Sequence, residues 1–225
     1  MIPTRHLVCV PYVHQPYFDA FKATQRFDDR IDTVFLPVDN TRVNRGIMMS
    51  HNLGLRVALE YGAEWLTVCS AAIRFGHEGG LDWLRALDER SDHDVVEAAD
   101  VFGWHLIAFK VDLLRRVGSW DENFTPYGFD DIDLSLRIQR AKGMDGRTEQ
   151  VWSKVRVDVK DMGMAHSVKL AGVQLPPERV EEQIAYFRRK WGRHPGESEI
   201  LAFDTPFGDP ANPISYWPPV VNHAR

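Results

Sequence analysis

Three acidic residues crowd into four positions near the middle of the chain, at Asp130, Asp131 and Asp133. Carboxylates this close repel one another, so the cluster indicates a bound cation or a group that exchanges protons. An Asp at the start of a helix also has a structural explanation, because it caps free N–H groups and suits the helix dipole. Three of them directly after Tyr127-Gly128-Phe129 favour a functional site over capping alone.

The elements that must position this cluster alternate between strands and helices. Short apolar runs predict buried strands, and apolar residues at helical spacing predict amphipathic helices. The predicted strands are residues 6–10, 31–38, 65–69, 94–99, 105–109 and 151–159, and the predicted helices are residues 16–26, 48–61, 81–90, 111–117, 131–142 and 176–191. This alternation predicts an α/β fold with a parallel sheet and helices on both faces.

The loops at one edge of this sheet are the expected ligand site. In parallel sheets ligands bind beyond the C-terminal ends of the strands. Residues 11–14, 39–44 and 70–74 follow the first three predicted strands, so we expect them to form one crevice together with the acidic cluster.

The composition is that of a globular protein. The chain has 225 residues, of which 44% are hydrophobic and 26% charged, and its net charge of −5 argues against a general polyanion-binding surface. No apolar run is long enough to span a bilayer, and the N-terminus does not resemble a signal peptide. Cys9 and Cys69 lie in apolar runs and are expected to be buried free thiols, so the expected location is the reducing cytoplasm. The basic run at residues 188–190 is expected to be a solvated face.

The segment at residues 117–143 resembles a motif of inverting glycosyltransferases of the GT-A fold, especially family 2 and the related galactosyltransferase C-terminal segment. In that motif a Gly, an aromatic residue and Asp-Glu precede an aromatic/Gly loop, then Glu-Asp-x-Asp and a helix that ends at Gly. The matching residues here are Gly118, Trp120-Asp121-Glu122, Tyr127-Gly128, Asp130-Asp131-Ile132-Asp133 and Gly143. Weaker matches are Val10-Pro11, Val38-Asp39-Asn40, Asn44-Arg45-Gly46, Asn52-Leu53-Gly54 and residues 186–192.

This resemblance implies a fold and a reaction. The fold is a three-layer αβα sandwich with a mostly parallel central sheet, formed by residues 1–170, and a C-terminal helix and Pro-rich tail at residues 171–225 pack on it. The reaction is the transfer of a sugar from a nucleotide-sugar donor to an acceptor hydroxyl with inversion. By the motif match Asp131 is the general base, while Asp130 and Asp133 orient acceptor hydroxyls or tune Asp131.

The resemblance also implies which residues bind the donor and the substrate. The donor-binding residues are Pro11, Asp39, Asn44, Ser70 and Arg74. For Asp39 an Asx-turn after the strand is the competing interpretation. Trp120 and Tyr127 flank the carboxylates, where their rings either stack on a sugar or pack in the interior.

The chain departs from the family after the third predicted strand. The family there carries Asp-x-Asp or Asn-Pro-Asp, which binds ribose and a divalent metal, whereas this chain has the degenerate Ser70-Ala71-Ala72. Mg²⁺ and Mn²⁺ prefer oxygen ligands, and the side chain of Ala72 has none.

Three outcomes are compatible with this departure. Metal-independent catalysis is favoured, with Arg45, Arg74 or Lys169 neutralising the leaving diphosphate. A Mn²⁺ or Mg²⁺ ion could instead be held by other groups, of which His166 is the best candidate. The remaining outcome is a catalytically inactive protein that binds nucleotide sugars or glycans.

A nucleotidyltransferase of similar α/β topology is disfavoured. Such enzymes carry a Gly-rich, basic loop after the first strand, and residues 11–15 are neither Gly-rich nor basic. The acceptor stays open between a glycan, a protein, a small molecule and a modified nucleic-acid base.

Overall fold

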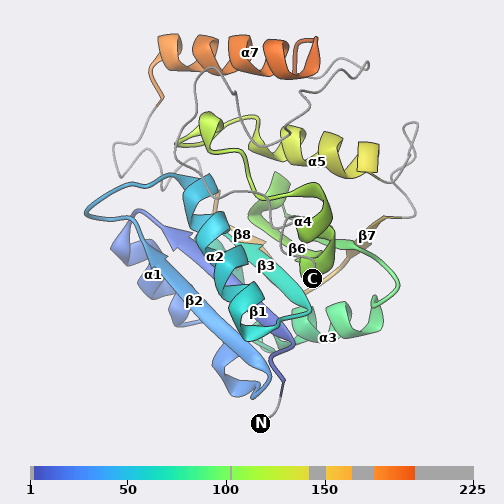
Figure 1. Ribbon diagram of the computed structural model, residues 1–225. Helices are drawn as coiled ribbons and strands as arrows, with labels where there is room; N and C mark the ends of the chain where they lie inside the picture. Colours follow the sequence, from blue (N-terminus) through green and yellow to red (C-terminus); the bar gives the residue numbers. More distant parts are fainter. Residues whose placement is uncertain (1–2, 102, 142–150, 164–174, 196–225) are drawn as a thin grey trace.

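A six-stranded sheet forms the centre of the protein (Figure 1). The computed structural model describes residues 3–101, 103–141, 151–163 and 175–195. The strands are β1 (His6–Tyr12), β2 (Thr33–Asp39), β3 (Trp65–Cys69), β5 (Val95–Ala98), β6 (Leu106–Lys110) and β7 (Trp152–Val155), in the order β2-β1-β3-β6-β5-β7.

Only β6 runs against the other strands of this sheet. It pairs antiparallel with both β3 and β5, whereas β1 pairs parallel with β2 and β3, and β5 pairs parallel with β7. The chain passes from β5 to its neighbour β6 through a short connection that contains a 3₁₀ turn, η2 (Gly103–His105), and a connection this short joins antiparallel strands. The predicted α/β class with a mostly parallel sheet is confirmed.

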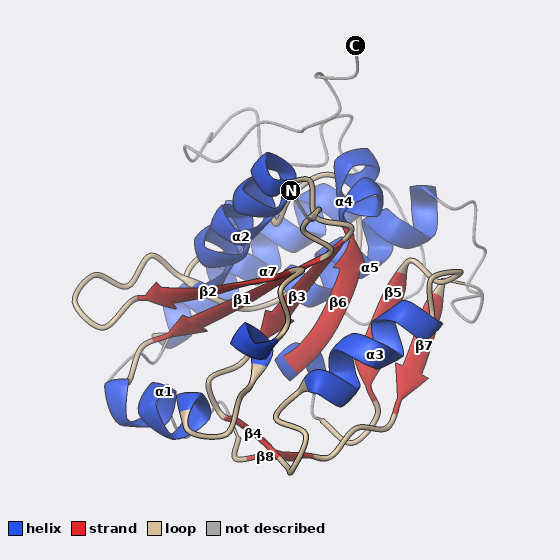
Figure 2. Cartoon of the chain, turned by 90° about the horizontal axis from the view of Figure 1, so that it is seen from below, coloured by secondary structure: helices blue, strands red, loops and turns tan. Residues whose placement is uncertain are grey.

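Helices cover both faces of the sheet, which gives the three layers (Figure 2). Helices α1 (Gln15–Lys22) and α3 (Leu81–Glu89) pack on one face. On the other face α2 (Ile47–Tyr61) and α4 (Val111–Val117) pack on the strands. Helix α5 (Asp130–Ala141) packs against α4, and α7 (Pro177–Trp191) lies farther from the sheet (Figure 1).

Successive residues of β1 point into two different hydrophobic clusters. Leu7 and Cys9 belong to the cluster under α2 and α4, while Val8 and Val10 belong to the cluster under α1 and α3. All four side chains are fully buried. A strand covered on both faces reads as a continuous apolar run, which is why the period-two alternation of an exposed strand is missing here.

Helix α2 lies very close to the sheet at Gly54. A Cβ atom at this position would lie 2.9 Å from Cβ and Sγ of Cys9, so only Gly permits this approach. The helix ends at Tyr61, and its C-cap, Gly62, has a left-handed φ of 66°, a conformation that favours Gly at this position.

The structure differs from the predicted elements at two places. The strand predicted at residues 151–159 is divided into β7 and β8 (Val159–Asp161). Strand β8 pairs antiparallel with a strand that was not predicted, β4 (Ile73–Phe75), in a separate two-stranded sheet. Three-residue strands carry too little periodicity to be recognised in the sequence.

Cys9 and Cys69 are buried and free, as predicted. Within the described residues no helix combines the length and the apolar character that crossing a membrane would need. The predicted Pro-rich tail lies mostly outside the described residues, which end at Pro195.

A buried group of charges joins α7 to the start of α5. The Lys190 ammonium lies 2.5 Å from an Asp121 carboxylate oxygen and 2.8 Å from an Asp133 carboxylate oxygen. Asp133 also accepts a hydrogen bond from Arg137 Nε at 2.9 Å. Two carboxylates and two cations therefore compensate one another in the interior, as burial of charge requires.

The expectation of a solvated basic face is wrong for Lys190 and right for Arg188 and Arg189, which are exposed. The reason is helical spacing, because position 190 continues the buried stripe of α7 that includes Gln183 and Phe187.

Replacement of Lys190 by Met tests how much this charge group contributes to the free energy of unfolding. The variant leaves Asp121 and Asp133 with one cation between them, so we expect the free energy of unfolding to fall by about 3–5 kcal/mol. Arg188→Met, on the exposed side of the same helix, should change it by less than about 0.5 kcal/mol. Urea unfolding followed by circular dichroism measures both, and equal stability of the two variants would contradict the assignment.

Candidate functional site

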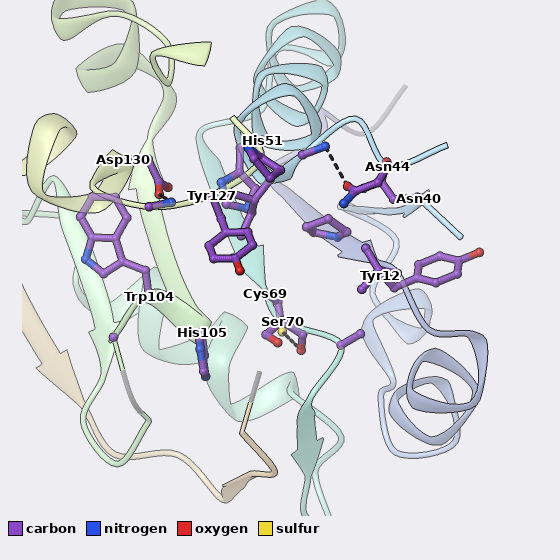
Figure 3. Close-up of a pocket in the computed structure, with 18 of the residues that line it drawn as sticks. Tyr12, Asn40, Asn44, His51, Cys69, Ser70, Trp104, His105, Tyr127 and Asp130 are labelled. Atoms are coloured by element: carbon purple, nitrogen blue, oxygen red, sulfur yellow. Dashed lines mark hydrogen bonds between the residues drawn. The ribbon is translucent and has the colours of Figure 1, made fainter. Parts of the chain in front are cut away.

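A cavity of about 350 Å³ opens at the C-terminal ends of β1 and β3, next to the start of the antiparallel strand β6 (Figure 3). It is lined by residues from all four segments expected to form a crevice. These include Pro11–His14 after β1, Asn40 and Asn44 after β2, Ser70 and Ala71 after β3, and Asp130 and Asp131 at the start of α5. The edge of the sheet is the one at which open α/β sheets bind ligands.

The loop before α5 is fixed against the start of α2. Ile47 N donates to Pro126 O at 2.8 Å. A Cβ atom on Gly46 would lie 2.9 Å from Pro126 Cα, and Gly46 has a φ of 82°, so this position needs Gly for both its space and its conformation. This contact sets where Tyr127 and the acidic cluster enter the cavity wall.

Two members of the acidic cluster line the cavity. Asp130 Oδ1 accepts a hydrogen bond from Gly128 N at 3.2 Å, and Asp131 Oδ1 accepts one from Ile132 N at 2.8 Å. Burial, and next the negative charge of Asp131, raise the pKa of Asp130 to about 7. Near neutral pH the Asp130 carboxyl is therefore close to half protonated, which lets two adjacent acids share one wall.

The third member, Asp133, does not line the cavity. Its side chain is fully buried and accepts a hydrogen bond from Trp191 Nε1 at 2.8 Å, in addition to its contacts with Lys190 and Arg137. The prediction that Asp133 orients acceptor hydroxyls is wrong, because the helix turns this side chain into the core. Its charge is a smaller cause of the raised pKa of Asp130.

The two aromatic residues of the motif have different positions. Trp120 is fully buried, with its ring 5.0 Å from that of His51 and 5.5 Å from that of Phe109, so the predicted stacking of Trp120 on a sugar is wrong. Tyr127 lines the cavity, and its hydroxyl accepts a hydrogen bond from Leu175 N at 3.0 Å. The stacking of Tyr127 on a sugar stays a prediction.

Three of the five predicted donor residues line the cavity. They are Pro11, Asn44 and Ser70. The amide oxygen of Asn44 accepts from Gly46 N at 2.9 Å, and Ser70 Oγ accepts from Ala72 N at 3.1 Å. Both side chains therefore also shape their own loops.

Asp39 and Arg74 are not in the cavity lining. Asp39 forms the Asx-turn that was the competing interpretation, accepting from Thr41 N at 2.8 Å and Thr41 Oγ1 at 2.7 Å, and these bonds lower the pKa of Asp39. Arg74 Nη1 donates to Ala71 O and Ile73 O, and burial lowers the pKa of its guanidinium.

Two histidines of the cavity wall are not among the predicted site residues. His51 on α2 is buried, and burial lowers its pKa to about 3, so the imidazole is neutral. His105 precedes β6, and its Nδ1 lies 2.6 Å from Asp161 Oδ2. The two partners are separated by 56 positions, so nothing in the sequence joins them.

The described residues do not offer a ligand set for a divalent metal. The segment after β3 contributes Ser70 and two alanines to this region, and no group of three His, Cys, Asp or Glu side chains that could hold a metal ion occurs in the part of the chain that the structure describes. The predicted ligand His166 lies outside the described residues.

Comparison with known proteins finds likeness in structure only. No model of a known protein family matches the chain, and no curated protein sequence matches it. Similar solved structures include a mannosyltransferase from Pyrobaculum calidifontis with GDP-Man and Mn²⁺, which is 19% identical over 60% of this chain and 51% of that one, with a TM-score of 0.43.

Two further glycosyltransferases are similar at this level. Drosophila β1,4-galactosyltransferase 7, solved with xylobiose, is 10% identical over 72% of each chain, with a TM-score of 0.42. TarS of S. aureus is 11% identical over 82% of this chain and 43% of its own, with a TM-score of 0.48. The chain thus spans about half the length of the mannosyltransferase and less of TarS. At these identities and TM-scores the likeness does not assign the chain to a family.

Asp130→Asn tests the protonation of the acidic cluster through stability. The folded state holds the Asp130 proton up to about pH 7, whereas the unfolded chain releases it near pH 4, so this carboxyl lowers stability progressively as pH rises between these values. Asn keeps the oxygen that accepts from Gly128 N but has no charge. We expect the melting temperature of the variant minus that of wild type to increase from pH 4 to pH 7 and then to level off. Each kcal/mol of difference in the free energy of unfolding corresponds to ~2–4 °C.

Scanning calorimetry at intervals of pH measures this difference. Asp112→Asn, at an exposed acid on α4, is the control and should give a flat difference. A flat difference for Asp130→Asn as well would contradict the raised pKa.

Proposed function

We propose that this protein is a glycosyltransferase that transfers a sugar from a nucleotide-sugar donor to an acceptor hydroxyl with inversion. The observation that carries the proposal is the position of Asp131 at the start of α5, in the wall of a cavity whose other walls are the strand-end loops after β1, β2 and β3. The motif resemblance at residues 117–143 supports the same assignment.

The cavity has one polar wall and one acidic wall. Asn40 and Asn44 lie on one side of it, and Asp130 lies on the other, beside Trp104 (Figure 3). A nucleotide would occupy the amide side, near Pro11, with its diphosphate along the loop at Ser70. The transferred sugar would then lie toward the acidic wall, where the acceptor enters.

Asp131 is the general base of this proposal. It takes the proton of the acceptor hydroxyl while the acceptor oxygen forms a bond to the anomeric carbon, and the bond from that carbon to the diphosphate oxygen breaks with its electron pair. Attack from the side opposite the leaving group gives inversion. In its protonated form, which its pKa of about 7 keeps populated near neutral pH, Asp130 would donate a hydrogen bond to the acceptor.

Metal-independent catalysis is part of the proposal. The described residues of the cavity lack a ligand set for Mn²⁺ or Mg²⁺, and Arg45 and Arg74 do not line it. The partners are a nucleotide-sugar donor and an acceptor that is a glycan, a protein, a small molecule or a modified nucleic-acid base.

A second candidate is a nucleotide-sugar or glycan binding protein without catalysis. Ser70-Ala71-Ala72 in place of Asp-x-Asp favours it. Donor hydrolysis in the absence of acceptor separates the two, because a transferase releases sugar slowly to water and a binding protein does not.

Asp131→Asn tests the assignment of the base. The amide cannot accept the acceptor proton, so we expect turnover or donor hydrolysis to fall by about 10²–10⁴-fold, while donor affinity by calorimetry stays close to that of wild type. Asp112→Asn serves as the surface control and should keep full activity. An Asp131→Asn protein with normal turnover would refute the role of this residue.

A further inference from the structure

Among the described residues, the cavity wall has no lysine or arginine to neutralise a leaving diphosphate. The groups there that can become positive are His14, His51 and His105. His51 is excluded, because burial lowers its pKa to about 3. Of the other two, His105 is the one bonded to a carboxylate, since His14 Nδ1 has no hydrogen-bond partner in the described part of the chain.

The backbone holds His105 against the loop that replaces Asp-x-Asp. Ser70 N donates to His105 O at 2.7 Å, and the next residue, Leu106, pairs with Cys69 in the β3–β6 ladder. Figure 3 shows His105 and Ser70 toward the same end of the cavity, away from Asn40 and Asn44. The backbone of His105 is thus held beside Ser70, at the loop where this chain departs from the family motif.

Asp161 lies next to His105. Its Oδ2 lies 2.6 Å from His105 Nδ1, and its Oδ1 accepts from Gly163 N at 2.8 Å. Strand β8 brings Asp161 there by pairing with Ile73 of β4. The two side chains are only 10% and 12% exposed, so their interaction is little screened by water. A carboxylate in this position orients the imidazole.

We propose that His105, oriented by Asp161, binds the β-phosphate of the donor and takes the place of the metal ion at the leaving diphosphate. This inference rests on the proposed function. When the bond between the anomeric carbon and the diphosphate oxygen breaks, that oxygen keeps the electron pair, and the imidazolium N–H groups and their charge stabilise it. The proton of the acceptor goes to Asp131, so His105 gains and loses none. Asp161 is a positioning residue, because it acts through His105.

Comparison of nucleoside diphosphates with monophosphates isolates the proposed contact between His105 and the β-phosphate. UDP and UMP, and GDP and GMP, are titrated by calorimetry into wild type and His105→Phe in EDTA. Phe keeps a ring of similar size and removes both nitrogens. We expect the affinity for the diphosphate to fall by about ten- to a hundredfold in the variant, because a hydrogen bond to a charged group is lost, while the affinity for the monophosphate is unchanged.

Two further variants separate a specific contact from a general loss of structure. Asp161→Asn keeps the side-chain shape but not the charge, and should reduce the ratio of diphosphate to monophosphate affinity in the same direction. His93→Phe removes a histidine that lies 2.8 Å from Asp92 outside the cavity, and should leave the ratio unchanged. If His105→Phe does not fold, Asp161→Asn carries the test.

The outcomes distinguish the inference from the function on which it rests. Two results would overturn the role of His105 and leave the glycosyltransferase proposal standing. In the first, His105→Phe has the same ratio of diphosphate to monophosphate affinity as wild type. In the second, wild type prefers the diphosphate only when Mn²⁺ is present. Wild type that binds none of the four nucleotides, with or without Mn²⁺, would overturn both.

Discussion

The buried contact of Lys190 with Asp121 and Asp133 is the constraint on which the candidate site depends. One ammonium group joins α7 to Asp121, which precedes the loop before α5, and to Asp133 in the first turn of α5. Without it two carboxylates would face each other in an interior that cannot solvate them. The Tyr186 hydroxyl donates to Asp121 at 2.6 Å as well, so α7 holds this segment through several groups.

The same helix also fixes the loop between these two acids. Gln183 Nε2 donates to Phe124 O at 2.7 Å and to Tyr127 O at 3.1 Å. With the loop fixed at both ends and in the middle, the start of α5 has one orientation, and the acidic cluster is divided by helical geometry. Asp133 faces the core and compensates cations, whereas Asp130 and Asp131 face the cavity.

The sequence predicted the αβα layers, the strand-end crevice and Asp131 in its wall, because apolar runs and the acidic motif are local signals. It could not predict that Lys190 is buried or that His105 meets Asp161, since these contacts join residues 69, 57 and 56 positions apart. Trp120 was misassigned for a related reason. An aromatic residue beside a carboxylate looks the same in the sequence whether it faces a ligand or the core.

The most direct test of the account is the melting temperature of the protein in a panel of nucleotide sugars, with and without Mn²⁺. A ligand that binds only the folded state at 100 times its dissociation constant adds about 2.7 kcal/mol to stability. We expect that at least one donor raises the melting temperature by several degrees and that Mn²⁺ adds little. No shift with any donor in either condition would contradict the central claim that this cavity is a nucleotide-sugar site.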